Sequence, residues 1–115
     1  MKQFIEEFTL NERFNESKKI LLKHPSRIPV IVEKSQDCDL NEIQKKKYLV
    51  SRDLSISEFM FIIRKRIHLD PAQAIFIMIN NTLPSSNSKM GEIYENYKNE
   101  DGFLYAIYTS ENTFG

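Results

Sequence analysis

The sequence predicts an α+β fold in which two short helices precede a sheet-forming unit. Two observations predict it. After the helical segments, the predicted elements follow the order strand, strand, helix, strand, short helix, strand. The first and last strands are apolar at both alternating sets of positions, so neither face of the sheet suits water. One central helix covers one face only, so we expect the N-terminal helices to lie across the other.

The two N-terminal helices are predicted over Lys2–Phe8 and Leu10–Lys23. The second ends before His24-Pro25, because proline cannot continue a helix and biases the preceding residue away from helical angles. Advancing about 100° per residue places three apolar side chains on one stripe, and Ile20 lies about 100° to its side. The stripe consists of Leu10, Phe14 and Leu21.

Four strands are predicted from short apolar runs that are bounded by turn residues. Arg27–Lys34 and Lys46–Arg52 form a hairpin, which is closed by the long polar stretch from Ser35 to Gln44. A buried strand follows at Ile75–Ile79, and the last strand is predicted over Phe103–Tyr108, after an Asp-Gly turn.

A central helix is predicted to begin at Ser55 or Ser57, because either side chain can cap it, and to run to about His68. A shorter helix is predicted over Met90–Lys98. One stripe of the central helix is apolar and is expected to face the core. This stripe consists of Ile56, Met60, Ile63 and Ile67.

Without the first two helices, this order of elements is that of the β-grasp fold of ubiquitin. At 115 residues the chain is long enough for one hydrophobic core and too short for two. We therefore predict a single ubiquitin-like domain, residues 1–115, with two additional N-terminal helices. Its expected parts are a helical layer over residues 1–24, a β-grasp core over residues 25–109 and a flexible tail over residues 110–115.

Charge and composition argue against several classes of protein. Sixteen basic and sixteen acidic side chains cancel, whereas a nucleic-acid-binding protein derives affinity from excess positive charge. No run approaches the ~20 apolar residues of a transmembrane helix, and Glu6 and Glu7 interrupt any secretory signal. The single cysteine, Cys38, cannot form an internal disulfide or a Cys-x-x-Cys metal site. We therefore expect a cytoplasmic protein without a metal.

A groove for an aliphatic side chain is predicted between the second strand and the central helix. Phe59 and Ile62 lie roughly 70° to 130° to one side of the core stripe, so they are free to face this groove. Tyr48, Val50 and Leu54 are placed to line it with them. The alternative is that Phe59 and Ile62 simply widen the core face of the helix.

A second apolar pocket is predicted where the second helix crosses the sheet. Ile20 is free to face away from the stripe of its own helix, and Glu16 lies beside it because residues four apart share a helix face. The expected pocket has one carboxylate at its rim, which suits an indole or phenol ring. The strand residues expected in it are Pro29, Ile31, Leu49 and Phe103.

The second strand of the hairpin runs between the two pockets. Its first two residues are Lys46 and Lys47, and Lys45 directly precedes it. In the β-grasp order this strand lies at the edge of the sheet, and an exposed edge can accept an extra strand from a peptide. The lysines either keep a solvated edge from aggregating or form a basic rim that attracts acidic residues of such a peptide. Both interpretations stay open from the lysines alone.

The sequence ends in Gly115, after a short polar tail. Glycine reaches backbone angles that are closed to other residues, so a tail ending in it can thread a narrow active site and present its carboxylate for activation. Taken alone, this feature is outweighed by the simpler alternative that the sequence happens to stop there.

Six segments together resemble a known family. They are Arg27–Lys34, Lys46–Val50, Ile62–His68 with Phe59, Asn80–Pro84, Asp101–Tyr105 and Phe114-Gly115. The chain resembles, over nearly its whole length, the autophagy-related protein eight family of ubiquitin-like modifiers. This family includes the GABA-A-receptor-associated protein and microtubule-associated light chain three.

The resemblance implies a modifier, not an enzyme, that is joined through Gly115 to the amine of phosphatidylethanolamine. It implies an ATP-using activating enzyme, a conjugating enzyme and a processing and deconjugating cysteine protease as partners. It further implies a cytoplasmic monomer that marks autophagosome membranes once it is lipidated, and that binds receptors carrying an aromatic-x-x-aliphatic motif. No cofactor is implied beyond the covalent lipid.

The resemblance also assigns residues to the two pockets. Glu16, Ile20, Pro29, Lys47, Leu49 and Phe103 match the aromatic pocket of the family, and Tyr48, Val50, Leu54, Phe59, Ile62 and Arg66 match its aliphatic pocket and rim. One departure is Ser51, which stands where the family commonly has proline. Another is that family members usually carry residues beyond the glycine, so Gly115 is expected to be either the product of processing or the encoded end.

Two other functions stay open from the sequence. One is an enzyme built on Cys38 with His24 or His68, although residue counts as loose as these occur in most chains. The other is an unconjugated ubiquitin-like trafficking or cytoskeletal adaptor that binds the same peptides. In the first helix, the apolar side chains either dock on the domain, which we favour, or contact membrane or tubulin.

Overall fold

The computed structural model describes residues 2–110, which form four helices and four strands. In chain order the elements are α1 (Phe4–Glu7), α2 (Leu10–Lys23), β1 (Arg27–Lys34), β2 (Lys47–Ser51), α3 (Ile56–Arg66), β3 (Phe76–Met78), α4 (Met90–Tyr97) and β4 (Leu104–Thr109). The sheet has the order β2-β1-β4-β3, with β1 parallel to β4 and both other pairs antiparallel. This arrangement confirms the predicted α+β, ubiquitin-like β-grasp fold with two additional N-terminal helices.

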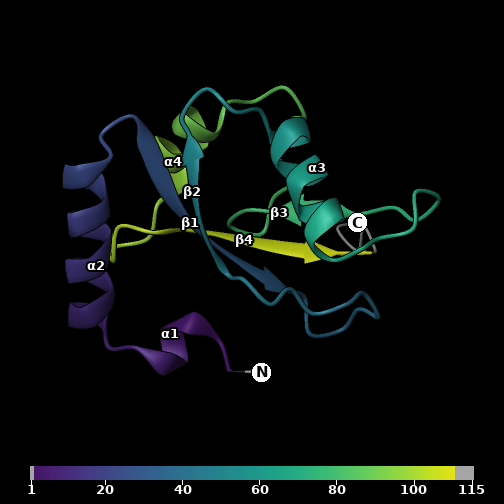
Figure 1. Cartoon of the computed structure of the whole chain (residues 1–115), viewed down its shortest axis with the longest axis horizontal. Coiled ribbons are helices and arrows are strands. Elements are labelled where there is room, and N and C mark those ends of the chain that lie inside the picture. The colour runs from purple at the N-terminus through teal and green to yellow at the C-terminus, as the bar shows by residue number, and fades with distance from the viewer. Residues whose placement is uncertain (1, 111–115) are drawn as a thin grey trace.

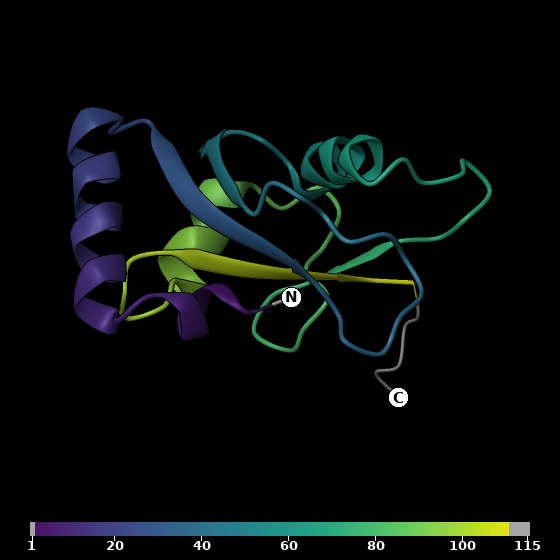
Figure 2. The same ribbon diagram turned by 60° about the horizontal axis from the view of Figure 1, so that its bottom comes forward.

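The sheet has apolar side chains packed on both faces, as the strand sequences predict. Figure 2 shows α3 and α4 on one side of the sheet and α1 on the other, and α2 stands where β1 and β4 begin (Figure 1). The larger core includes Val30, Ile63 and Tyr108. A smaller cluster, which we call the N-terminal core, consists of Phe4, Ile31 and Phe103, with Ile20 and Tyr105 packed against it.

Capping residues set the start of both long helices. The hydroxyl of Thr9 accepts a hydrogen bond from the backbone N–H of Glu12, whose carboxylate accepts one from the N–H of Thr9. Ser55 and Glu58 form the same reciprocal pair at α3. Of the two predicted capping residues, Ser55 and not Ser57 is therefore the cap. At its other end α3 stops two residues before the predicted His68, which adopts a positive φ of 54°.

The face that α2 turns toward the sheet differs from the predicted one. Leu10 and Phe14 were expected on the buried stripe, but each is 45% exposed. The side chains that α2 buries are Arg13 and Ser17, and Ile20 packs against the N-terminal core. The helix is therefore rotated by roughly 70° from the orientation that its apolar stripe predicts.

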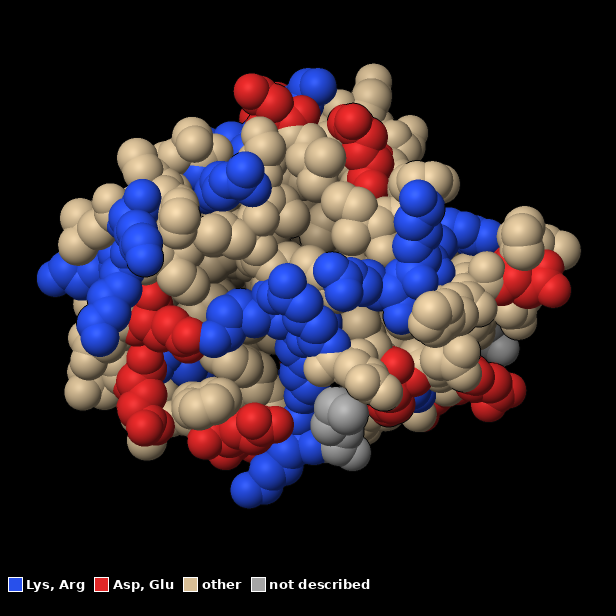
Figure 3. Space-filling model, viewed as in Figure 1, with Lys and Arg blue, Asp and Glu red and all other residues tan. Residues whose placement is uncertain are grey.

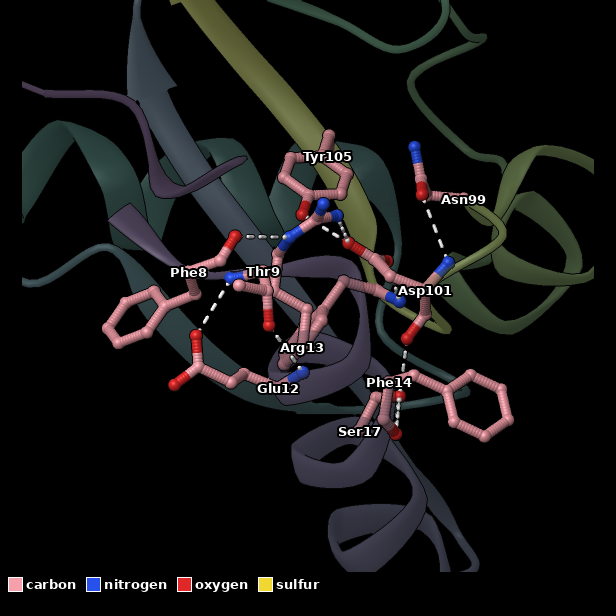
Figure 4. A network of polar contacts seen from close by, with 10 residues as sticks. Phe8, Thr9, Glu12, Arg13, Phe14, Ser17, Asn99, Asp101 and Tyr105 are labelled. Atoms are coloured by element: carbon pink, nitrogen blue, oxygen red, sulfur yellow. Dashed lines mark hydrogen bonds and ion pairs between the residues drawn. The ribbon is translucent and has the colours of Figure 1, made fainter. Parts of the chain in front are cut away.

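A buried polar network around Asp101 explains this rotation (Figure 4). The Asp101 carboxylate accepts hydrogen bonds from Arg13 Nη1 at 2.5 Å, from Tyr105 Oη at 2.5 Å and from the backbone N–H of Phe103 at 2.8 Å. The backbone oxygen of Asp101 accepts a hydrogen bond from Ser17 Oγ at 2.6 Å. Burial, together with the bond to Asp101, raises the pKa of Tyr105 well above its usual range, so this phenol remains a donor.

The turn beside this network requires a glycine. Gly102 has a φ of +88°, and a Cβ built on it would lie 2.3 Å from Ser17 Oγ. The absence of a side chain therefore lets α2 approach the start of β4 closely.

The connection between β1 and β2, predicted as a polar loop, is packed against the larger core. Cys38, Leu40 and Ile43 are all buried there. The backbone oxygen of Asn41 accepts a hydrogen bond from Tyr108 Oη at 2.6 Å, which ties the loop to β4. Three apolar residues spread through a polar segment are enough to close one end of the core.

Candidate functional site

Strand β2 is an edge of the sheet, as predicted, and pairs on its inner side with β1. The three lysines around its start have different surroundings. Lys47 forms an ion pair with Glu16 of α2, and Lys46 Nζ lies 3.2 Å from a carboxylate oxygen of Glu33. Lys45 is exposed, and its ammonium lies 5.2 Å from the ring centroid of Tyr48. Two of the predicted basic-rim lysines are therefore balanced by carboxylates within the domain.

The predicted aromatic-pocket residues lie together on the face of the sheet that α1 and α2 cover. Ile31 and Phe103 are buried in the N-terminal core, and Ile20 packs against them. Pro29 faces Leu49 across the β1–β2 pair, and the Glu16–Lys47 ion pair lies in the same region. Glu16, the carboxylate predicted for the rim, is therefore paired with a lysine of β2.

Phe4 of α1 is a member of this group that the sequence did not assign to the pocket. Its side chain is 5% exposed and packs edge-on against Phe103, with the ring centroids 5.3 Å apart. The backbone N–H of Phe4 donates to Glu33 at 2.8 Å, which fixes the start of α1. The favoured prediction, that the apolar side chains of the first helix dock on the domain, is confirmed for Phe4. The side chains of Ile5 and Phe8 remain 45% and 39% exposed.

The predicted aliphatic-pocket residues lie on the opposite face, between β2 and α3. Tyr48 and Phe59 pack edge-on, with centroids 6.4 Å apart, and Arg66 lies 6.0 Å from the Tyr48 ring. Val50 is buried with them, and the half-buried residues at the margin are Leu54 and Ile62. The cations Lys45 and Arg66 thus both lie near the Tyr48 ring.

Phe59 corrects the helical-wheel prediction for α3. Its side chain is 0% exposed and belongs to the larger core, so it does not stand beside the core stripe. The buried set on α3 is Ile56, Phe59 and Ile63, whereas Met60 is only half-buried. The alternative in which Phe59 widens the core face is therefore the correct one, because the ring of Tyr48 on β2 packs against it.

One polar atom in this group has no partner. Tyr48 Oη is buried and makes no hydrogen bond within residues 2–110. Burial raises the pKa of this phenol, and the charge of Arg66 opposes the shift. A buried hydroxyl without a partner is unfavourable, so it marks a position at which a ligand could improve the hydrogen bonding.

The surface over these elements carries both charges. Figure 3 shows a band of Lys and Arg side chains across the part of the face where β2 and α3 lie, with Asp and Glu side chains on its margins. Across residues 2–110, no group of three or more His, Cys, Asp and Glu side chains is placed to hold a metal ion. No helix in that range is long and apolar enough to cross a bilayer. Gly115, the predicted conjugation residue, lies outside the described residues, as does nearly all of the predicted tail.

Comparisons with known proteins agree with this arrangement. The family model described as "Autophagy protein Atg8 ubiquitin like" matches residues 12–115. The chain is 51% identical to autophagy-related protein 8i of Arabidopsis thaliana, with complete coverage of both chains. It is also 51% identical to autophagy-related protein 8 of Schizosaccharomyces pombe, with 98% of this chain and 93% of that protein covered.

A solved structure shows the same fold. The crystal structure of Trypanosoma brucei ATG8 superposes with a TM-score of 0.91 at 37% sequence identity, and the match covers 100% of this chain and 99% of that one. The sequence likeness and the structural likeness both extend over the β-grasp unit and α2. The chain therefore belongs to the Atg8 family of ubiquitin-like autophagy proteins.

Proposed function

We propose that this chain is a ubiquitin-like modifier that is conjugated through Gly115 to phosphatidylethanolamine and recruits receptors carrying an aromatic-x-x-aliphatic motif. It acts in the cytoplasm as a monomer and, once lipidated, on the autophagosome membrane. The observation that carries the binding part is that the sheet with edge strand β2 has an apolar cluster on each face. The larger core includes Tyr48 and Val50 of β2, and the N-terminal core lies behind β2, at β1 and the start of β4.

This geometry suits the spacing of the motif. A peptide that adds a strand to the edge of β2 has alternate side chains on opposite faces of the sheet. The aromatic and aliphatic residues are three positions apart, an odd number, so they point to opposite faces about 10 Å apart along the strand. One reaches the face of Leu49 and Ile20, and the other reaches the face of Leu54 and Ile62. The edge supplies backbone hydrogen bonds, and the clusters supply selectivity.

The conjugation step needs little from the chain itself. An ATP-using activating enzyme and a conjugating enzyme convert the Gly115 carboxylate into a thioester. The amine nitrogen of phosphatidylethanolamine then forms an amide bond with the Gly115 carbonyl carbon, and the thiol of the conjugating enzyme leaves. The modifier contributes an unhindered terminal residue and no catalytic group. A cysteine protease later hydrolyses the amide.

We expect Gly115→Ala to abolish lipid conjugation, because the added methyl group hinders both entry into the enzyme sites and attack on the carbonyl. The test combines the activating enzyme, the conjugating enzyme, ATP and phosphatidylethanolamine liposomes with the protein, and measures gel mobility and liposome co-flotation. Thr113→Ala is the matched control and should conjugate like the wild type. Equal conjugation of wild type and Gly115→Ala contradicts the assignment of Gly115. No conjugation of either, with active enzymes, favours the unconjugated adaptor.

We expect Ile62→Ala to weaken the binding of an aromatic-x-x-aliphatic peptide by about 1–3 kcal/mol, the scale of one apolar anchor. Ile62 is half-buried at the margin of the aliphatic cluster, so its truncation leaves the larger core intact. Calorimetric titration measures the affinity, and thermal denaturation confirms the fold. Phe61→Ala is the matched control on the same helix, because Phe61 is 58% exposed. Unchanged affinity in Ile62→Ala would remove this residue from the peptide site.

A further inference from the structure

Edge strand β2 carries its free backbone groups on alternate residues. The N–H of Val32 donates a hydrogen bond to the backbone oxygen of Lys46 at 2.8 Å. The N–H of Arg52 donates one to the backbone oxygen of Ser26 at 3.3 Å, and both bonds continue the register of the β1–β2 pair. In an antiparallel pair, hydrogen-bonded positions alternate with positions whose backbone groups face away from the partner strand. The residues of β2 that face away from β1 in this way are Lys47, Leu49 and Ser51.

Ser51 is the last of these three residues, and its two backbone groups differ in their surroundings. Its backbone oxygen accepts a hydrogen bond from the N–H of Leu54 at 3.2 Å, which closes a turn beyond β2. Its N–H has no acceptor within residues 2–110, and the residue is exposed. Ser51 therefore offers the final donor of the free edge.

The side chain nearest to this edge does not occupy that donor. Arg27 Nη1 donates a hydrogen bond of 3.3 Å to the backbone oxygen of Leu49, and a carbonyl oxygen can accept two. Leu49 can therefore still accept a bond from a peptide. A guanidinium carries donors only, so Arg27 cannot bond to the N–H of Ser51. This N–H is open to the carbonyl oxygen of a bound chain.

The position of the Ser51 donor matches the length of the aromatic-x-x-aliphatic motif. Lys47 and Leu49 are two residues apart, or about 7 Å along the strand, whereas the two motif side chains are about 10 Å apart. Including Ser51 lengthens the row of bonding groups to about 13 Å, which covers the motif. Val50, directly before Ser51, belongs to the larger core, and Leu54 packs against it. The additional bond therefore lies at the aliphatic end of the peptide.

We propose that the backbone N–H of Ser51 donates a hydrogen bond to the bound peptide and holds its aliphatic end against β2. This inference rests on the proposed function, since it concerns the same peptide and the same edge. Proline at this position would leave the β1–β2 bonds intact, because the N–H of Ser51 is not used in them, but it would remove the donor. This chain therefore holds a peptide by one more backbone bond than a chain with proline there. Peptides that stay extended through the aliphatic residue gain from this bond, and peptides that bend away before it do not.

The first test compares Ser51→Pro with Ser51→Ala in the full-length protein. Calorimetry measures the affinity for one synthetic aromatic-x-x-aliphatic peptide that has three further residues at each end. Ser51→Pro should bind it about three- to ten-fold more weakly, the effect of losing one hydrogen bond. Ser51→Ala is the matched control, because it loses only the hydroxyl, which accepts from the N–H of Asp53 at 3.2 Å, and keeps the backbone donor. It should bind like the wild type, and thermal denaturation checks that both variants are folded.

A second test uses the wild-type protein, so its result does not depend on the folding of a variant. Amide NMR spectra are recorded with and without a saturating amount of the same peptide. The N–H signals of Lys47, Leu49 and Ser51 should move downfield, and hydrogen exchange at Ser51 should slow at least about ten-fold. Val50 is the internal control, because its N–H lies in the β1–β2 pair and is protected before the peptide is added.

Two results would overturn this inference alone. One is equal affinity of Ser51→Pro and Ser51→Ala for the peptide. The other is an amide of Ser51 that does not respond to the peptide while those of Lys47 and Leu49 do. If the wild type does not bind the peptide, or if none of these three amides responds, strand addition at β2 is wrong. In that case the proposed function loses its binding part together with the inference.

Discussion

Replacing Asp101 with alanine is expected to lower the free energy of unfolding by about 3–5 kcal/mol, because it leaves the Arg13 guanidinium buried without its counter-charge. The same change removes the acceptor of the Tyr105 hydroxyl and of the Phe103 N–H. For a domain of this size the melting temperature should fall by about 10–20 °C. Chemical and thermal denaturation measure both quantities.

Glu100→Ala is the matched control for this prediction. Glu100 is the neighbouring carboxylate, it is exposed, and within residues 2–110 its side chain forms no hydrogen bond or ion pair with α2. Its removal should change stability by less than about 0.5 kcal/mol. A second variant tests the charge argument, since replacing both members of the pair, as in Arg13→Met with Asp101→Leu, should recover part of the loss. If Asp101→Ala is as stable as Glu100→Ala, the network does not hold α2 in place.

The effect of Asp101 reaches the candidate site through α2. Arg13 and Ser17 hold this helix against the start of β4, and Glu16 and Ile20 lie on the same helix, beside the N-terminal core. We therefore expect loosening of the network to shift Glu16 and Ile20, which are candidate residues of the aromatic pocket, before the whole domain unfolds. Amide hydrogen exchange in Asp101→Ala should rise in α2 more than in β1 or β4.

The sequence predicted the positions of elements better than their orientations. The bounds of α2 and β1 match the prediction, because local signals define them: Thr9 caps the helix, and Pro25 follows its end. β3 is shorter than predicted by one residue at each end. At its C-terminal end Ile79 pairs with Thr82 across a turn in which Asn80 and Asn81 adopt positive φ angles. The direction that α2 faces was not predictable from its apolar residues, because polar side chains decide it.

In the candidate site, the features of single elements were predicted, and contacts between distant elements were not. Leu49 was predicted at one pocket and Tyr48 and Val50 at the other, and the family resemblance added Lys47 to the first. In the structure Tyr48 and Val50 belong to the larger core, whereas Leu49 faces Pro29 and Lys47 pairs with Glu16. Contacts between elements distant in the sequence were missed. The place of Phe4 in the N-terminal core depends on its backbone bond to Glu33, which no periodicity reports.

The burial of Phe59 changes how the peptide site should be tested. A variant at this position could lose peptide binding because a wall of the candidate pocket is missing, or because the fold is destabilised by the loss of a large core side chain. Truncations at the half-buried margin, such as Ile62→Ala, separate the two reasons. Helical wheels cannot make this distinction, because the width of the buried face depends on the element that packs against the helix.

We expect Phe59→Ala to lower the free energy of unfolding by about 3–5 kcal/mol, the range for a buried phenylalanine whose removal leaves a cavity. Phe59 is 0% exposed and its ring packs edge-on against Tyr48, so neighbouring side chains cannot fill the space without moving the start of β2. Urea denaturation measures the loss directly. The matched control is Phe61→Ala, two residues along the same helix and 58% exposed, which should stay within about 0.5 kcal/mol of the wild type. If the two variants prove equally stable, the ring of Phe59 faces solvent, and the interpretation of α3 as a helix with Phe59 beside its core stripe would be restored.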